Sequence, residues 1–148
     1  MSKSLTIITG ASRGIGRTIA LALAEEGKVR DDALHMVLLA RSLEKLNETA
    51  TLVNNIDTEV TTSCHEIDLS DMLTLPEKLQ EILEPLSRAT QYDSCLLVNN
   101  AGSVGPLGTC ESLSNITELQ QSIILNITSS IWVSCEYFVL YNNEHKIC

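Results

Sequence analysis

The sequence lacks an excess of positive charge and any long apolar segment. Its 10 Lys and Arg residues are outnumbered by 19 Asp and Glu residues, which gives a formal net charge of −9 at pH 7. Such a charge argues against nucleic acid or an anionic membrane surface as the main partner, but it is compatible with a local basic pocket for a phosphate. No stretch approaches the run of about 18 apolar residues that a membrane span needs. The apolar run before Gly10 is also too short for a signal peptide.

The sequence also lacks the cysteine and histidine spacings that are typical of metal sites. The five cysteines are widely and irregularly spaced, with no C-x-x-C pair, which argues against a zinc site and against a disulfide framework. We interpret them as free thiols in a reducing cytosol, and we therefore expect a cytoplasmic protein. The histidines His35, His65 and His145 are not spaced as metal ligands or as a nucleophile pair. We expect His35 and His65 to flank strands, and we expect no metal.

Short apolar segments at regular intervals predict a sheet. With 148 residues, of which 44% are hydrophobic, the chain is long enough for one domain with a buried core. Apolar and β-branched segments that end at glycine or at polar residues are typical of strands. The expected strands span residues 4–9, 35–40, 59–65 and 94–98.

Helical periodicity between these strands completes an alternating pattern. The expected helices span residues 14–27, about 43–53, 71 to about 87, and 115 to about 141. Pro85 predicts that the third helix ends or kinks near Glu84. The polar stretch 28–34 predicts a longer loop than the fold needs. Alternating strands and helices with right-handed crossovers form a doubly wound parallel sheet with helices on both faces. We therefore expect an α/β protein of the Rossmann type, with a single domain over residues 1–148.

Three glycines mark the turn between the first strand and the first helix. The segment reads Thr9-Gly10-Ala11-Ser12-Arg13-Gly14-Ile15-Gly16. Glycine lets the backbone turn tightly and approach a pyrophosphate, while the helix N-terminus offers unpaired N–H groups and a partial positive charge to the anion. The motif predicts a dinucleotide site. The alternative is a glycine turn that only packs.

A second motif, Asn99-Asn100-Ala101-Gly102, follows the fourth expected strand. The two motifs, about ninety residues apart, resemble the paired signature of the short-chain dehydrogenases/reductases. Three further runs, at 40–42, 96–105 and 125–129, resemble the sepiapterin reductase branch of that family. The resemblance covers essentially the whole chain and implies the N-terminal portion of the family's fold, with about four strands and their flanking helices. It also implies NADPH-dependent reduction of a small carbonyl substrate, such as a pterin side-chain ketone or a diketone.

The end of the second expected strand indicates which cofactor the site prefers. NAD-selective sites place an acidic residue there to accept the ribose 2′-hydroxyl, whereas this chain has Ala40-Arg41-Ser42. Arg41, together with Arg13, would bind a 2′-phosphate through charge-assisted hydrogen bonds, and Ser42 would add a hydroxyl donor. The alternative is that both arginines are ordinary solvated surface residues. We therefore expect NADP(H) as the cofactor.

The resemblance assigns further residues to the cofactor. Asp68 would bond the adenine amino group, with the Leu69 backbone beside it, although helix capping by Asp68 or Ser70 is an alternative. Residues 99–102 would line the ribose side, and Asn99 would also tie neighbouring strands together. The expected cofactor-binding residues are Gly10, Ser12, Arg13, Gly14, Ile15, Gly16, Arg41, Ser42, Asp68, Leu69, Asn99, Asn100, Ala101 and Gly102.

The resemblance also implies that Asn126 is the asparagine of the family's catalytic tetrad, whose backbone helps to hold a proton-relay water. The alternative is a polar residue on a solvated helix face. The family's Tyr-x-x-x-Lys, which supplies the proton, does not occur among the 148 residues, so we expect this chain to be inactive by itself. The other interpretation is a non-catalytic dinucleotide-binding module. The last expected strand would lie at an open sheet edge, and the helix at 115–141 would mediate a homo- or hetero-oligomer.

Overall fold

A computed structural model of the chain describes residues 2–30, 32–89, 92–109 and 115–144. The strands are β1 (Lys3–Thr9), β2 (Ala33–Ala40), β3 (Thr61–Glu66) and β4 (Ser94–Val98). They form one parallel sheet in the order β3-β2-β1-β4. The predicted parallel sheet is confirmed. Because its strands are parallel, their carboxyl ends all lie at the same edge.

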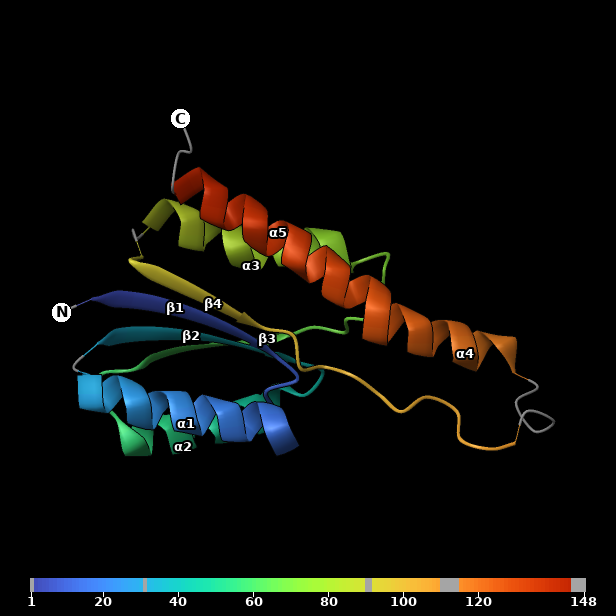
Figure 1. Cartoon of the computed structure of the whole chain (residues 1–148), viewed down its shortest axis with the longest axis horizontal. Helices are drawn as coiled ribbons and strands as arrows, with labels where there is room; N and C mark the ends of the chain where they lie inside the picture. Colours follow the sequence, from blue (N-terminus) through green and yellow to red (C-terminus); the bar gives the residue numbers. More distant parts are fainter. Residues whose placement is uncertain (1, 31, 90–91, 110–114, 145–148) are drawn as a thin grey trace.

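Helices cover both faces of this sheet (Figure 1). One face is covered by α1 (Gly14–Arg30) and α2 (Leu43–Ile56), and the other by α3 (Leu75–Ala89) and α5 (Ser129–Glu144). A π-helical turn, η1 (Ile124–Thr128), joins α5 to α4 (Ile116–Ile123). Figure 1 shows α4 projecting beyond the sheet. The doubly wound α/β class is confirmed.

The strands contribute side chains to two separate cores. On the side of α3 and α5, the buried cluster includes Leu5, Ile7, Val37, Leu39, Leu75, Leu79, Leu83 and Val133. On the side of α1 and α2, it includes Ile8, Ala20, Ala24, Met36, Leu38, Leu46 and Val53. Because successive strand residues point to opposite faces, one continuous apolar segment fills both cores. The buried sheet therefore gives firm support to the loops at its carboxyl edge.

The first helix extends further than the sequence predicts. It passes through Gly27 and ends at Arg30, and β2 begins three residues later, so the loop expected over 28–34 is wrong. Gly27 is buried, and a Cβ at this position would lie 3.4 Å from Leu34 Cδ2. This distance is ordinary van der Waals contact, so Gly27 occupies a helical position packed against Leu34 and does not end the helix. An ion pair of 2.5 Å between Glu26 and Arg30 spans the last turn.

The third helix continues past Pro85, where the sequence predicts an end or a kink. It runs to Ala89 with the proline inside it. Proline removes one helical hydrogen bond, but Leu83 is buried and Leu86 packs against the same core. Burial of these two side chains stabilises the last turns, as tertiary packing generally does for short helices.

The C-terminal helical region spans 116–144 instead of 115–141, and Asn115 caps it. Asn115 Oδ1 accepts hydrogen bonds from Thr117 N at 3.1 Å and Glu118 N at 3.3 Å. The residues that pack against the core are Leu125, Val133 and Tyr137, with Ser129 also buried. The apolar residues that recur at helical spacing in this region are instead exposed and form an apolar stripe, which consists of Ile116, Leu119, Ile123, Ile127, Ile131, Cys135 and Phe138.

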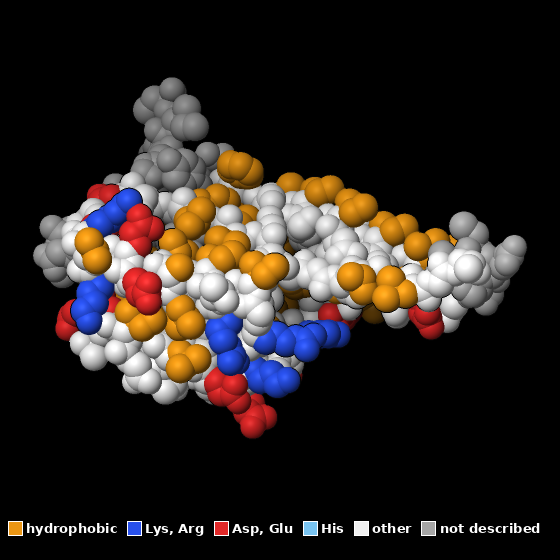
Figure 2. Space-filling model, turned by 60° about the horizontal axis from the view of Figure 1, so that its bottom comes forward, with side chains coloured by type: hydrophobic (Ala, Val, Ile, Leu, Met, Phe, Trp, Pro, Cys, Tyr) orange, Lys and Arg blue, Asp and Glu red, His pale blue; other side chains and the backbone are white. Residues whose placement is uncertain are grey.

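This helix also has the length and composition of a membrane-spanning helix, which the sequence analysis did not expect. Residues 116–139 contain a segment of mean hydropathy 1.2, of which 11% is buried. One such helix is weak support for a membrane location, because Gln120, Gln121 and Asn126 interrupt the apolar run. Figure 2 shows hydrophobic side chains along the projecting part of the molecule and basic side chains gathered beside its base.

Candidate functional site

The turn between β1 and α1 lies against the loop that follows β4. Gly16 is buried, and a Cβ there would lie 2.4 Å from Gly10 O and 2.5 Å from Asn100 Nδ2. This close approach requires glycine. Gly14 differs, because its φ of +57° favours glycine, yet no described atom lies within 4 Å of the position of its Cβ. The backbone at Gly14 is therefore open to an approaching ligand.

Two residues that the sequence analysis missed connect this glycine turn to α2. Arg17 donates from Nε to Thr49 Oγ1 at 2.9 Å and from Nη2 to Ser12 O at 2.6 Å. It also forms an ion pair of 3.0 Å with Glu48. Thr49 is fully buried, and its hydroxyl donates to Ala11 O at 3.0 Å. These bonds fix the glycine turn at a constant distance from the first turns of α2.

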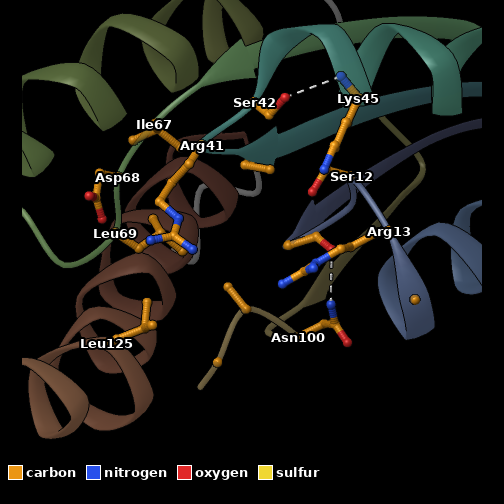
Figure 3. Close-up of a pocket in the computed structure, with 15 residues that line it drawn as sticks. Ser12, Arg13, Arg41, Ser42, Lys45, Ile67, Asp68, Leu69, Asn100 and Leu125 are labelled. Carbon is orange, nitrogen blue, oxygen red and sulfur yellow. Dashed lines mark hydrogen bonds between the residues drawn. The ribbon is translucent and has the colours of Figure 1, made fainter. Parts of the chain in front are cut away.

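The end of β2 presents a cation and a helix cap. Ser42 is the N-cap of α2, and its Oγ accepts a hydrogen bond of 3.4 Å from Lys45 N. Arg41 is exposed and follows Ala40, so no carboxylate lies at this strand end. Figure 3 shows Arg41 and Arg13 extending into the same cavity from opposite sides.

The segment after β3 forms a turn beside this cavity. Asp68 Oδ1 accepts hydrogen bonds from Ser70 N at 2.9 Å and from Ser70 Oγ at 2.6 Å. This is a local turn and not a helix cap, because α3 starts only at Leu75. Asp68 and Leu69 both line the cavity. Their contact with adenine stays a prediction.

The two neighbouring asparagines after β4 have different partners. Asn100 Nδ2 donates to Thr9 O at 3.1 Å and to Gly10 O at 3.3 Å, so it ties this loop to the end of β1. Asn99 Nδ2 donates instead to Ser134 Oγ in α5 at 2.9 Å. The strand-tying role that the sequence analysis gave to Asn99 therefore belongs to Asn100.

Asn126 lies within η1 and holds the same loop from the other side. Its Nδ2 donates to Ser103 O at 2.7 Å, and its Oδ1 accepts from Ser103 N at 2.9 Å. Its Nδ2 also donates to Ser122 Oγ at 3.1 Å. Single π-helical turns occur frequently at functional sites. The side-chain amide of Asn126 thus holds the Ser103 loop in place, while the catalytic role of Asn126 stays a prediction.

These segments surround a cavity of about 460 Å³ at the carboxyl ends of the strands, the edge where doubly wound sheets bind ligands. The predicted residues that line it are Gly10, Ser12, Arg13, Gly14, Arg41, Ser42, Asp68, Leu69, Asn100, Ala101 and Gly102. The predicted residues Ile15, Gly16, Asn99 and Asn126 do not line it. The lining residues that the sequence analysis missed are Ala40, Lys45, Ile67 and Leu125.

The charge of this cavity is unbalanced. Within the described part of the chain, Arg13, Arg41 and Lys45 form no ion pair with a carboxylate. Asp68 is the one acidic residue among those that line the cavity. An adjoining hollow of about 570 Å³ shares both arginines. Three cations without carboxylate partners beside an open glycine turn form a site with positive potential, which suits an anion.

Comparisons with known proteins agree with this geometry. The family model for short chain dehydrogenases matches residues 4–145. Benzil reductase ((S)-benzoin forming) of Bacillus subtilis is 31% identical over 130 residues, which are 88% of this chain and 46% of that protein. Sepiapterin reductase of Chlorobaculum tepidum is 30% identical over 150 residues, which are 97% of this chain and 56% of that protein. The chain thus spans about half the length of these relatives.

Solved structures show the same arrangement of strands and helices. An alcohol dehydrogenase from the archaeon Thermococcus sibiricus, complexed with 5-hydroxy-NADP, matches with a TM-score of 0.76 at 27% identity, over 97% of this chain and 55% of that one. A short-chain dehydrogenase from Sphingobium yanoikuyae in complex with NADPH matches with a TM-score of 0.69 at 26% identity, over 90% and 46% of the two chains. Sequence motifs, sheet order and family match lead to one conclusion: the chain belongs to the short-chain dehydrogenase family of oxidoreductases.

Proposed function

We propose that this chain binds NADP(H) in the cavity at the carboxyl ends of its strands. The observation that carries the proposal is the pair Arg13 and Arg41, which extend into the cavity from opposite sides and have no carboxylate partner among the described residues. NAD-selective sites place an acid at the end of the second strand, where this chain has Arg41. Guanidinium groups bind phosphate through strong, charge-assisted hydrogen bonds. The NADP and NADPH complexes of the similar structures also support this choice.

The rest of the cavity suits the other parts of such a cofactor. The open backbone at Gly14 and the N-terminus of α1 would receive the pyrophosphate. Asp68 and Leu69 would lie beside the adenine, and Ala101 and Gly102 beside a ribose. The nicotinamide, when bound, supplies the hydride, while the residues of this chain bind and orient it.

We propose that the reaction associated with this fold is the reduction of a small carbonyl compound. The names of the related benzil reductase and sepiapterin reductase support a ketone as the substrate class, and a pterin side-chain ketone is our first candidate. Asn126 would take the part of the tetrad asparagine. No Tyr-x-x-x-Lys occurs in the 148 residues, and general acid catalysis contributes about 10²- to 10⁴-fold in rate. We therefore expect this chain by itself, in the cytoplasm, to show no appreciable turnover.

A second candidate function is that of a non-catalytic, associating module. The outer side of β4 is unpaired by any described strand, and Leu96 on β4 is 43% exposed. The apolar stripe of α4, η1 and α5 is exposed as well. Open strand edges and apolar patches are typical of interaction surfaces. Sedimentation of the purified chain tests this candidate, because a monomer at all concentrations would contradict self-association.

The experiment that tests cofactor binding is calorimetric titration of the purified chain with NADPH and with NADH. We expect NADPH to bind at least about tenfold more tightly, and we expect Arg41→Ala to remove most of this preference. Arg30→Ala is the matched control, since Arg30 is paired with Glu26 at the end of α1 and lines neither cavity by the glycine turn. Equal affinities for both nucleotides, or an unchanged preference in Arg41→Ala, would contradict the proposal.

A second assay tests the expected inactivity. NADPH oxidation is followed by absorbance in the presence of sepiapterin or a simple diketone, with protein free of host reductases. Turnover that is abolished by Asn126→Ala would show that a substitute acid exists within the chain. Tyr137 and Tyr141, both in α5, would be examined first.

A further inference from the structure

Lys45, in the first turn of α2, lines the same cavity as Arg13 and Arg41. We propose that Lys45 is a third cation for the ribose 2′-phosphate and thereby a specificity-determining residue for NADP(H) over NAD(H). The inference rests on the NADP(H) binding proposed above, and it adds a residue that neither the glycine motif nor the end of β2 indicates.

The position of Lys45 on α2 directs its side chain to the expected phosphate. Lys45 follows the N-cap Ser42 by three residues, so both side chains lie on the same face of the helix. Figure 3 shows the Lys45 side chain extending along the cavity wall toward Ser12. Arg41 enters the cavity from the segment just before this helix. A phosphate that contacts Arg41 and Ser42 would therefore also lie near Lys45.

The ammonium group of Lys45 is free of a competing carboxylate among the described residues. Glu48, three residues along α2, would be its natural helical partner, but Glu48 is paired with Arg17 at 3.0 Å. The backbone of Lys45, by contrast, is held in place, since its carbonyl accepts a hydrogen bond from Arg17 Nη2 at 3.3 Å and lies 3.1 Å from Thr49 Oγ1. The main chain is held in place while the charge is left for an external anion.

The helix dipole makes the placement of Lys45 unfavourable in the absence of an anion. The N-terminus of a helix carries a partial positive charge, so cations in the first turn are repelled by it. At α2, Arg41 precedes the cap, and the first turn holds both Lys45 and Glu44, so the Glu44 carboxylate offsets one of the two positive charges at this end of the helix. A bound phosphate would relieve this repulsion and interact favourably with both side chains and with the helix.

The test uses the full 148-residue chain and two small probes, adenosine 2′,5′-bisphosphate and adenosine 5′-monophosphate. They differ only in the 2′-phosphate. For Lys45→Ala we expect affinity for the bisphosphate to fall about 3- to 10-fold, which lies between the effect of an exposed ion pair and that of a strong charge-assisted bond. Affinity for the monophosphate should change less than about twofold. Lys45→Arg should retain the preference.

The control is Lys78→Ala, which removes an exposed lysine of α3 that lines neither cavity. It should leave the affinity for both probes unchanged, and circular dichroism should show that each variant is folded. An equal loss for both probes in Lys45→Ala would place the lysine at another phosphate and overturn the inference, as would no loss at all. If the unmodified chain does not prefer the bisphosphate, the NADP(H) proposal itself is wrong. A preference that survives Lys45→Ala but is lost in Arg41→Ala overturns only the role of Lys45.

Discussion

Arg17 on α1 and Thr49 on α2 are joined by a hydrogen bond of 2.9 Å between Nε and Oγ1. The bond lies under the glycine turn, because Thr49 also donates to Ala11 O at 3.0 Å. One buried hydroxyl therefore accepts from one helix and donates to the turn that precedes it. This contact therefore connects the glycine turn on one side of the cavity to α2 on the other side.

Removal of the Thr49 hydroxyl should weaken the fold and the site together. Thr49→Val keeps the shape of the side chain but leaves Ala11 O and Arg17 Nε without this partner, which we expect to lower the free energy of unfolding by about 1–3 kcal/mol. Urea denaturation measures this loss, and NADPH titration should show a weaker affinity. Thr51→Val is the control, since Thr51 is exposed and its hydroxyl bonds only Asn47 O of its own helix. A change in Thr51→Val as large as that in Thr49→Val would contradict the explanation.

Two glycines of the same motif should respond differently to alanine. Gly16→Ala places a methyl group 2.4 Å from Gly10 O, so we expect a loss of stability of about 1–3 kcal/mol from overpacking. Gly14→Ala contacts no described atom within 4 Å and carries only the strain of its positive φ, about 1–2 kcal/mol. Its methyl group should mainly obstruct the pyrophosphate. Thermal unfolding and NADPH titration of both variants separate these effects, and normal nucleotide affinity in a folded Gly14→Ala variant would count against the proposed site.

The two asparagines provide another matched pair. Asn100→Asp replaces a donor with a carboxylate oxygen that faces Thr9 O and Gly10 O, so we expect a loss of about 2–3 kcal/mol in stability. Asn99→Asp loses the bonds to Ser134 Oγ and Ser130 O, but Asn99 is exposed and water can solvate the new carboxylate, so we expect a smaller loss of about 1 kcal/mol. Chemical denaturation ranks the two variants, and the reverse order would show that Asn99 is the structural residue.

Stability should depend on pH through two histidines that lie within strands, not beside them as predicted. His35 in β2 bonds Tyr92 Oη and Ser63 Oγ, each at 2.8 Å. Burial and then the nearby His65 lower the pKa of His35, and burial lowers the pKa of His65 in β3. The folded state therefore binds fewer protons than the unfolded state. The corresponding stability is present above about pH 6.5, the ordinary value of histidine, and is lost as the pH falls through the lowered values.

Urea midpoints measured between pH 8 and pH 5 check this sign. We expect the midpoint of the unmodified chain to fall on acidification, and we expect His35→Gln to reduce that slope because one of the two groups is removed. A midpoint that rises as the pH falls toward 5 would contradict the direction of both pKa shifts.

The sequence predicted those parts of the site in which a short local motif lies next to a strand. The glycine turn, Arg41 at the end of β2 and the asparagines after β4 each lie next to a strand, and the parallel topology brings strand ends to one edge. Arg17 and Thr49 were missed because their partners lie on other elements of the fold, and Lys45 was missed because it lies within a helix and not next to a strand end. Their spacing within one helix gives no indication of how α1 and α2 approach each other.

The errors in the fold have a similar cause. Gly27 and Pro85 are residues that commonly end helices, but packing against Leu34 and beside Leu83 outweighs these local preferences. The exchange of roles between Asn99 and Asn100 reflects the alternation of side chains at a strand end. A shift of one residue reverses the direction of each side chain, and the sequence does not specify that register.

The wide turn of η1 sets the relative rotation of the two helices that it joins. Ser129 N donates to Ile124 O, five residues earlier, so one extra residue is accommodated, and in an ordinary α-helix one residue corresponds to a rotation of about 100°. This offset lets Asn126 bond Ser103 at the cavity while Val133 remains packed in the core. Deletion of one residue from η1 would produce a more regular helix that could satisfy only one of these two contacts. The π-helical turn therefore lets one continuous helical region contact the Ser103 loop at the cavity through Asn126 and the hydrophobic core through Val133.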